Sequence, residues 1–237
     1  MRTVAVVLAG GSGRRFGSAG PKQLRALAGR HLIEHCVLAF DQAPAIDDVL
    51  VVATADTCQQ VRQDLAGYPK VADVIQGGAS RTESTRRALD WLGARLPADS
   101  KVLFHDAARP LVDQRTIADS VAALDHFEAI GVVVPSSDTI VEVADGVIRR
   151  VLPRDTLARC QTPQGFRLSV IAAAYRLADM DPAFAAIPAT DDCGVVLRYL
   201  PDVPIAAVDG SERNLKVTYA ADLAVAAVLL DTSEPPH

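Results

Sequence analysis

Residues 8–23, LAGGSGRRFGSAGPKQ, combine glycines with basic side chains and contain no acidic residue. Glycines let the backbone approach an anion closely, and backbone N–H groups between a strand and a helix bind phosphate oxygens. Arg15 and Lys22 add the positive charge that a triphosphate requires. The segment therefore predicts a phosphate-binding loop. The alternative is a flexible glycine turn with solvated basic side chains.

Two well-known phosphate loops do not match this segment. A Walker A loop needs Gly-Lys followed by Ser or Thr, but Lys22 follows Pro21 and precedes Gln23. A dinucleotide-binding loop needs G-x-G-x-x-G, but the pattern that begins at Gly11 has Phe16 in its last position. The pattern that fits is A-G-G-x-G-x-R, followed after a short gap by P-K, and it favours a loop that wraps around a nucleotide.

The basic residues of the N-terminal segment stand apart from the rest of the chain. Residues 1–33 contain six Lys or Arg and no Asp or Glu, whereas the whole chain has a net charge of −5. This distribution predicts a confined anion site rather than a nucleic-acid surface, which needs a broader basic field. No apolar run in the sequence has the roughly 18 residues of a membrane span, so we expect no membrane partner.

Cysteine and histidine patterns offer other chemistry, which we disfavour. Four cysteines (Cys36, Cys58, Cys160 and Cys193) lie far apart in the sequence and indicate free thiols. With no signal-peptide pattern, they predict a cytoplasmic protein. Residues 31–35, HLIEH, match the zinc pattern H-x-x-E-H, but a third ligand is not apparent. We interpret that segment as an amphipathic helix.

Short apolar runs alternate with helical patterns along the chain. The expected strands are Thr3–Leu8, Val49–Ala53, Val71–Ile75, Val102–Phe104, Gly131–Val134 and Ile205–Val208. The expected helices are Leu32–Asp41, Thr57–Leu65, Ser80–Ala94, Gln114–Ala129, Leu168–Met180, Thr190–Leu197 and Ala220–Leu230. The alternation predicts a single-domain α/β fold over residues 1–231, with a mostly parallel sheet flanked by helices.

This fold would bring two segments to one edge of the sheet. The glycine loop follows the first expected strand, and residues 105–110, HDAARP, follow the strand at 102–104. Ligands of open α/β sheets bind at the carboxyl ends of the strands, so we expect both segments to line one site.

Residues 138–152, DTIVEVADGVIRRVL, interrupt the alternation. Asp145-Gly146 between two β-rich runs predicts a hairpin, which we expect to form a protruding arm over about residues 137–157. An isolated hairpin is marginally stable in water, so the arm is expected to pack against something, such as a second subunit. The tail at 232–237 is expected to be disordered.

Several motifs occur together in one order: LAGGSGRRF with PKQ, then GGASRTEST, HDAARP, DT, QTPQGF, TDD and NLKVT. In these motifs the sequence resembles the cytidylyltransferases of polyol phosphates, a family of Rossmann-like nucleotidyltransferases. The resemblance covers nearly the whole chain. HDAARP and QTPQ together are specific for this family, whereas the glycine loop alone indicates only a nucleotidyltransferase.

The resemblance implies roles for individual residues. Backbone groups of Ala9, Gly10 and Gly78 would frame cytosine, Ser84 would hydrogen-bond the base, and the triphosphate would be wrapped by Gly11, Ser12, Gly13 and Arg15. Lys22 and Lys216 would flank the α-phosphate, and together with Arg15 they are the expected catalytic residues. Asp106 would lie beside the phosphates and a Mg²⁺ ion. The polyol phosphate would be bound by Arg109, Thr139, Arg154, Thr162 and Thr190.

The resemblance also implies a reaction and an assembly. The substrate phosphate would attack the α-phosphorus of CTP in line, with pyrophosphate leaving. Because the nucleophile is already an anion, positioning and charge neutralisation would suffice, without a general base. Arg154 lies just beyond the hairpin, so a dimer through the arms would deliver it to the neighbouring subunit's site.

Four of these residues also have a plain structural interpretation. Asp106 and Thr190 could cap helices, Lys216 could be an ordinary lysine at a strand edge, and Arg154 could be a surface arginine. An inactive nucleotide-binding module would keep the fold. That module is disfavoured because the lysines, the arginines and Asp106 of the expected site are all present.

Two substrates remain open within the family. HDAARP and QTPQGF favour 2-C-methyl-D-erythritol 4-phosphate, whose cytidylylation belongs to non-mevalonate isoprenoid synthesis. The LAGG start and Phe16 depart from the residues that are common in the enzyme for that substrate. The segment DTIVEV resembles the enzymes that make CDP-ribitol from D-ribitol 5-phosphate for cell-envelope polymers, and the segment TDDCGVVLRYLP is compatible with them. We expect the first substrate and keep the second as the alternative.

Overall fold

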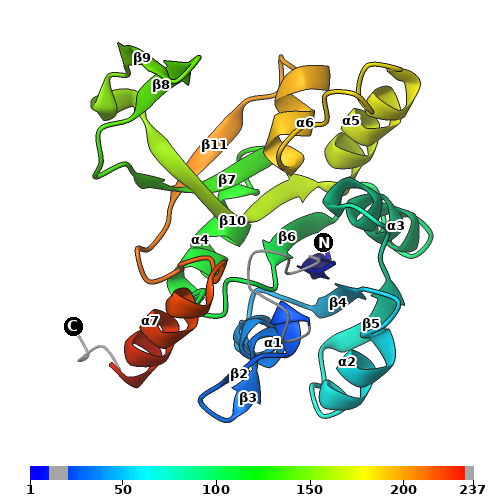
Figure 1. The fold of residues 1–237 in the computed structure, drawn as a ribbon. Helices are drawn as coiled ribbons and strands as arrows, with labels where there is room; N and C mark the ends of the chain where they lie inside the picture. Colours follow the sequence, from blue (N-terminus) through cyan, green and yellow to red (C-terminus); the bar gives the residue numbers. More distant parts are fainter. Residues whose placement is uncertain (11–20, 233–237) are drawn as a thin grey trace.

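Seven strands form the main sheet of the protein, in the order β11-β7-β10-β6-β1-β4-β5. A computed structural model describes residues 1–10 and 21–232 of the chain (Figure 1). The strands are β1 (Thr3–Ala9), β4 (Asp48–Ala53), β5 (Val71–Gln76), β6 (Lys101–Asp106), β7 (Ala129–Pro135), β10 (Ala158–Arg167) and β11 (Ile205–Asp209). Only β10 runs antiparallel to its neighbours, β6 and β7, which confirms the expected α/β fold with a mostly parallel sheet.

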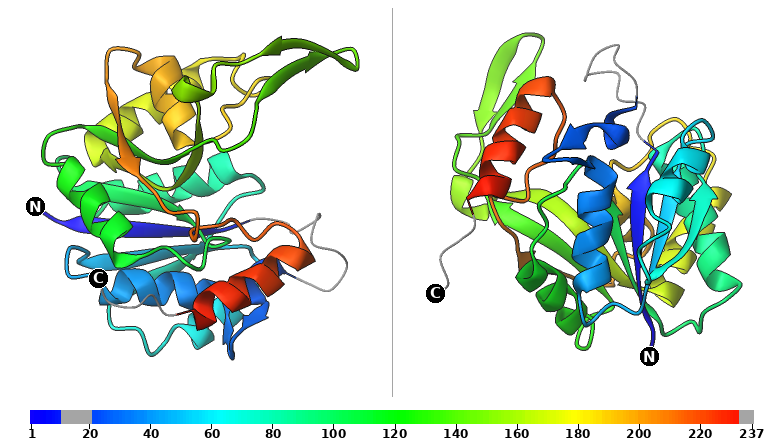
Figure 2. Two further views of the ribbon diagram at one scale, coloured as in Figure 1. Left: turned by 90° about the vertical axis from the view of Figure 1, so that its left-hand side faces the viewer. Right: turned by 90° about the horizontal axis from the view of Figure 1, so that it is seen from below.

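Helices cover both faces of this sheet. The helices α1 (Leu32–Gln42), α2 (Cys58–Asp64) and α4 (Gln114–Ala123) pack into one apolar cluster. The helices α3 (Arg81–Gly93), α5 (Leu168–Met180) and α6 (Asp192–Tyr199) pack into the cluster on the other face. Successive side chains of β1 alternate between the two clusters and are all buried, because the strand lies inside the sheet between two helical layers (Figure 2).

Two short hairpins stand outside the main sheet. One pairs β2 (Ala26–Leu27) with β3 (Arg30–His31), and it lies between the short 3-10 helix η2 (Lys22–Leu24) and α1. The other pairs β8 (Val141–Ala144) with β9 (Val147–Val151) and is followed by the 3-10 helix η3 (Arg154–Thr156). The last helix, α7 (Ala220–Asp231), completes the described chain, and the residues from 233 on lie outside it.

The β8–β9 hairpin, which we call the arm, extends away from the sheet (Figure 2). Asp145 and Gly146 have φ angles of 52° and 75°, as a two-residue hairpin turn with left-handed central residues requires. The expected Asp-Gly hairpin is therefore confirmed. Apolar arm side chains stay exposed in the single chain, namely Ile140, Val143, Val147, Ile148 and Val151.

Two of the differences between the structure and the sequence expectations concern α4 and β10. The expected helix at 114–129 is too long, because α4 ends at Ala123 and β7 already begins at Ala129. Strand β10 was not expected, because Pro163 and several polar residues break the alternation that identifies a strand. A bulge between Cys160 and Gln164 and a cis Thr162–Pro163 bond accommodate the proline.

Candidate active site

The carboxyl ends of β1 and β6 form the predicted edge of the sheet. The chain after β6 bonds back to β1, since the Ala107 N–H donates to the Leu8 carbonyl at 3.0 Å. The segment after β11 joins the same place, because the Val217 N–H donates to the Ala108 carbonyl at 2.8 Å. Residues from three distant parts of the sequence therefore meet at this edge.

Asp106, at the end of β6, lies between two cations. Its carboxylate is 2.6 Å from the Lys216 ammonium and 3.7 Å from Nε of Arg81. Burial on its own would raise the pKa of Asp106, but Lys216 and then Arg81 outweigh burial and hold that pKa well below its ordinary value. Asp106 is therefore an ionised carboxylate at neutral pH, not the helix cap that its sequence position allowed.

The two expected lysines converge on one short segment. Lys22 donates from Nζ to the Val217 carbonyl at 2.7 Å, next to Lys216. The Lys216 side chain is 43 % exposed, so its ammonium is accessible from solvent while it bonds Asp106. The structure places the Lys22 ammonium beside the backbone that carries Lys216, and the expected contact of both lysines with an α-phosphate stays a prediction.

Glycines and a buried serine form the neighbouring wall. Ser84 is buried, its hydroxyl accepts from the Gly78 N–H at 3.2 Å, and it donates to the Ser80 carbonyl at 2.9 Å. A Cβ on Gly10 would lie 2.9 Å from Ser84 Oγ, and a Cβ on Gly78 would lie 2.2 Å from Cβ of Glu83. Only glycine fits at both positions, so the end of β1 can approach the start of α3. Contact of this wall with cytosine, and of Ala9 within it, stays a prediction.

Arg109 is buried beneath Asp106 rather than extended into solvent. Its guanidinium donates to the Asn214 carbonyl at 2.8 Å and to the Cys160 carbonyl at 3.3 Å. Burial lowers the pKa of Arg109, and Asp106 opposes that shift. In this arrangement Arg109 joins the 106–109 turn to β10 and to the segment after β11, and the expected contact with a substrate phosphate stays a prediction.

Thr162 belongs to the same edge of the sheet. Its hydroxyl oxygen accepts from the Asp106 N–H at 3.1 Å, and it is also 3.1 Å from Nδ1 of His105. The Asn214 amide donates to the Thr162 carbonyl at 2.8 Å. The structure thus brings Thr162 and Asp106 together across two strands.

The other expected substrate residues are exposed in the single chain. Thr139 and Arg154 are exposed at the base of the arm, where Arg154 donates to the Ser137 carbonyl at 3.4 Å. Thr190 is exposed, and the cap of α6 is Asp191, which accepts from the Gly194 N–H. The expected triphosphate residues Gly11, Ser12, Gly13 and Arg15 lie outside the described residues.

A buried network that sequence reasoning missed supports Arg81. Asp192 is fully buried, and its carboxylate accepts from the Tyr175 hydroxyl at 2.6 Å and from the Thr85 hydroxyl at 3.2 Å. Its second oxygen is 2.7 Å from Nη2 of Arg81. Burial would lower the pKa of Arg81, but Asp192 and then Asp106 raise it above its ordinary value. An arginine in the first turn of a helix lies at the positive end of the helix dipole, which is unfavourable for a cation. Its presence at this position in the sequence therefore indicates an acidic partner.

His105 is a second residue that sequence reasoning missed. It is fully buried, and its ring meets the ring of Phe40 edge to face with centroids 5.1 Å apart. Burial is the main cause that lowers the pKa of His105 to about 4, against the opposing effects of the Arg109 carbonyl and Asp106. The imidazole is therefore neutral under ordinary conditions.

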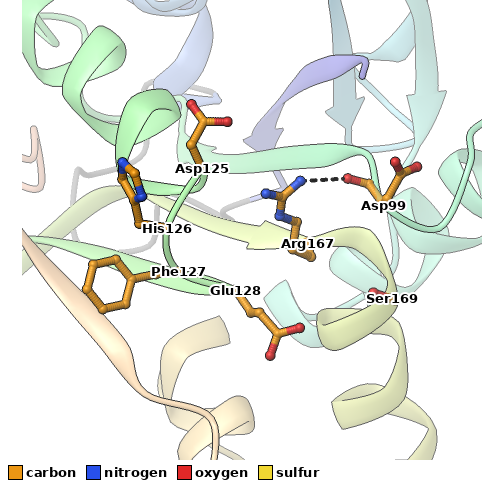
Figure 3. Close-up of a pocket in the computed structure, with 7 residues that line it drawn as sticks. All are labelled: Asp99, Asp125, His126, Phe127, Glu128, Arg167 and Ser169. Carbon is orange, nitrogen blue, oxygen red and sulfur yellow. Dashed lines mark hydrogen bonds between the residues drawn. The ribbon is translucent and has the colours of Figure 1, made fainter.

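A separate pocket of about 340 Å³ lies at the opposite edge of the sheet (Figure 3). Its lining residues precede β6 and β7 or lie where β10 ends and α5 begins, namely Asp99, Asp125, His126, Phe127, Glu128, Arg167 and Ser169. The Arg167 guanidinium donates to the Asp99 carbonyl at 3.1 Å, and it also bonds the Leu124 carbonyl. Arg167 therefore joins two loops, and the charge cluster around Asp106 lies at the other end of β6.

Three further observations concern metal binding and membrane insertion. Among the described residues, no group of three or more His, Cys, Asp or Glu side chains is placed to hold a metal ion. His31 bonds Asp64 at 2.9 Å, and His35 bonds the Leu27 carbonyl at 2.7 Å, so the two histidines of H-x-x-E-H have different structural partners. In the described part of the chain, every helix is too short or too polar to cross a bilayer.

Comparison with known proteins agrees with this geometry. The family model described as IspD, 2-C-methyl-D-erythritol 4-phosphate cytidylyltransferase, matches residues 3–232. A protein of that name from Thermobifida fusca is 51% identical, with 98% of this chain and 94% of that protein covered. The bifunctional ribulose 5-phosphate reductase/CDP-ribitol pyrophosphorylase Bcs1 of Haemophilus influenzae is 33% identical, with 95% of this chain and 47% of that protein covered.

Solved structures show the same architecture. A 2-C-methyl-D-erythritol 4-phosphate cytidylyltransferase from Thermus thermophilus is 28% identical with a TM-score of 0.73, covering 96% of this chain and 98% of that one. The fold of the 4-diphosphocytidyl-2C-methyl-D-erythritol synthase from Anaerococcus prevotii matches with a TM-score of 0.83 at 24% identity, covering 97% and 98% of the two chains. The chain therefore belongs to the IspD family of cytidylyltransferases.

Proposed function

We propose that this protein transfers CMP from CTP to 2-C-methyl-D-erythritol 4-phosphate in the non-mevalonate route to isoprenoids. The products are 4-diphosphocytidyl-2-C-methyl-D-erythritol and pyrophosphate. The observation that carries the proposal is the pairing of the ionised Asp106 with Lys216 and Arg81 at the sheet edge, where Lys22 bonds the Val217 carbonyl next to Lys216. Identity of 51% with the Thermobifida fusca protein over nearly the whole chain supports this substrate.

The reaction needs two charged groups to approach each other. An oxygen of the substrate phosphate attacks the α-phosphorus of CTP, and the bond from that phosphorus to the bridging oxygen of pyrophosphate breaks. Lys22 and Lys216 neutralise negative charge at the α-phosphate, and Arg15 does so from the glycine loop. Because the attacking phosphate is already an anion, charge neutralisation and alignment supply the catalysis.

Asp106 fits a role beside Mg²⁺. It is a low-pKa carboxylate next to the expected phosphates, and Mg²⁺ typically binds one or two carboxylates together with substrate phosphate oxygens. A bound Mg²⁺ would neutralise phosphate charge in the transition state. The described residues hold no complete protein ligand set for a metal, which agrees with a site that CTP itself completes.

We further propose a homodimer formed through the arms. Four valine and isoleucine side chains of the β8–β9 hairpin are at least half exposed in the single chain: Val143, Val147, Ile148 and Val151. Thr139 and Arg154 lie at the base of the arm, on either side of the β8–β9 hairpin. An arm that crosses to a partner would therefore place both residues in the partner's site. The four free cysteines support a reducing, cytoplasmic setting.

Substitution of Lys216 tests the proposed site. Lys216→Ala is expected to lower kcat by about 100-fold or more, because it removes a positive charge aimed at the reacting phosphate. Pyrophosphate release with CTP, Mg²⁺ and 2-C-methyl-D-erythritol 4-phosphate measures the effect, and product mass confirms the transfer. Lys70→Ala is the matched control, since Lys70 bonds the Ala43 carbonyl away from Asp106. Turnover of Lys216→Ala within twofold of wild type would remove Lys216 from the mechanism.

A further inference from the structure

His105 lies one residue before Asp106 on β6, and both of its ring nitrogens have partners. Nε2 is 3.0 Å from the Arg109 carbonyl oxygen, and Nδ1 is 3.1 Å from the Thr162 hydroxyl. The ring is fully buried against Phe40. Burying an imidazole without hydrogen-bond partners costs free energy, because its ring nitrogens lose their bonds to water. The two hydrogen bonds of His105 offset this desolvation cost.

The partners fix the direction of each hydrogen bond. A carbonyl oxygen only accepts, so Nε2 of the neutral ring must carry the proton and donate to Arg109. Nδ1 is then an acceptor, and the Thr162 hydroxyl must donate to it. The Thr162 oxygen is left to accept from the Asp106 N–H at 3.1 Å. Every donor in this chain of three hydrogen bonds finds an acceptor.

These hydrogen bonds hold both backbone groups of Asp106, its N–H and its carbonyl. The Arg109 N–H donates to the Asp106 carbonyl at 3.0 Å, so the 106–109 turn is closed on one side. His105 holds the carbonyl of the same Arg109, and through Thr162 it holds the Asp106 N–H. The Asp106 carboxylate can meet Lys216 and Arg81 only while this peptide keeps its place.

We propose that His105 is a positioning residue, which holds the Asp106 carboxylate beside Lys216 by orienting Thr162 and the 106–109 turn. It does not touch substrate. The proposal rests on the proposed function for the catalytic importance of Asp106 and Lys216. A loss of His105 would misplace these groups by a fraction of an ångström rather than remove a charge, and misplacement of this kind lowers turnover more than ground-state binding.

Three variants separate the two hydrogen bonds of the ring. His105→Phe keeps a ring but loses both bonds. His105→Asn places an amide oxygen where Nδ1 lay, so it can still accept from Thr162. His105→Gln places an amide N–H where Nε2 lay, so it can still donate to Arg109. Because the Asp106 N–H is reached through Thr162, the asparagine variant should retain more activity than the glutamine variant.

Steady-state kinetics give the decisive comparison. For His105→Phe we expect kcat to fall about 10- to 100-fold while KM for CTP changes less than about threefold. The double variant with Thr162→Val should be no slower than the slower single variant, because both substitutions break one hydrogen-bond chain. His35→Phe is the matched control, a buried histidine whose Nε2 bonds the Leu27 carbonyl at 2.7 Å.

Other outcomes would overturn the proposal. A folded His105→Phe with kcat within twofold of wild type would do so, and so would multiplicative losses in the double variant. If His105→Phe does not fold, the asparagine and glutamine variants decide. Equal losses in those two, in proportion to their lowered Tm, would assign His105 to fold stability alone.

A spectroscopic measurement keeps this test separate from the proposed function. Wild-type turnover reports on the function itself, and the variant ratios report on His105. Long-range ¹H–¹⁵N spectra of histidine-labelled protein should show His105 as the Nε2–H tautomer, with an Nδ1 shift that changes in Thr162→Val. An Nδ1–H tautomer would contradict the hydrogen-bond chain even if the wild type used a different substrate.

Discussion

A single carboxylate organises the candidate site at the residue scale. Asp106 bonds Lys216, faces Arg81 and is held through its backbone by Thr162. Asp106 and Lys22 could be expected from the sequence, because charged residues that follow apolar strands reach the ligand edge of a parallel sheet, whereas Lys216 was expected from the family resemblance alone. Arg81 could not be ranked from sequence, since its partners Asp106 and Asp192 are distant along the chain.

The cysteines allow a prediction at this same scale. Burial and then Asp106 raise the pKa of Cys36 far above its ordinary value, and burial followed by Asp191 does the same for Cys193. Cys160 is exposed. Because the thiolate is the reactive form, iodoacetamide near neutral pH should label Cys160 at least about 100-fold faster than Cys36 in the folded protein. Peptide mass spectrometry measures this, and rapid labelling of folded Cys36 would contradict its placement.

At the scale of elements, the central strands follow from their residues, and the irregular strand does not. The runs VAVVLA in β1 and VLVVA in β4 are apolar throughout, as strands buried on both faces require. β10 carries the motif QTPQGF, whose proline and polar residues lie at the candidate site. These residues break the apolar alternation by which a strand is recognised in a sequence. The expected end of α4 was wrong because Leu124 and Phe127 continue an apolar pattern, although the helix ends at Ala123 and β7 begins at Ala129.

The buried Asp192 connects three helices and gives a stability prediction at this scale. Tyr175 on α5 and both Thr85 and Arg81 on α3 direct polar groups at this carboxylate at the start of α6. Asp192→Ala leaves these groups buried without their partner, so it should lower the free energy of unfolding by about 3–5 kcal/mol. Urea unfolding measures the change. Tyr175→Phe, which removes one hydrogen bond, should cost only about 1–2 kcal/mol. A loss below about 1 kcal/mol for Asp192→Ala would show that the network contributes little.

For the whole molecule, the proposed dimer explains why the sequence places two expected site residues on the arm. Thr139 and Arg154 are exposed and remote from Asp106 in one chain, whereas the other expected residues that the structure describes lie on the body of the protein. A shared site would combine the body of one subunit with the arm of its partner. The Asp-Gly turn between two β-rich runs made the hairpin predictable, but the sequence of a single chain does not show which surface covers its exposed valines.

Mixing two inactive variants tests the shared site. Arg154→Ala and Lys216→Ala homodimers should each be nearly inactive. Subunit exchange at equal concentrations should restore about one quarter of wild-type activity, because half of the dimers are mixed and each holds one intact site. Pyrophosphate release after unfolding and refolding together measures the recovery. Refolding the two variants separately and then assaying them together without exchange is the control. No recovery from a dimeric mixture would show that Arg154 acts within its own chain or not at all.

The most direct test of the whole account is a parallel assay with two acceptors. Pyrophosphate release is followed with CTP and Mg²⁺, using 2-C-methyl-D-erythritol 4-phosphate in one series and D-ribitol 5-phosphate in the other. We expect kcat/KM for the first acceptor to exceed that for the second by at least about 100-fold. Equal values or a preference for ribitol phosphate would contradict the proposed substrate while leaving the cytidylyl transfer. CTP binding with no pyrophosphate release from either acceptor would contradict the enzymatic function itself.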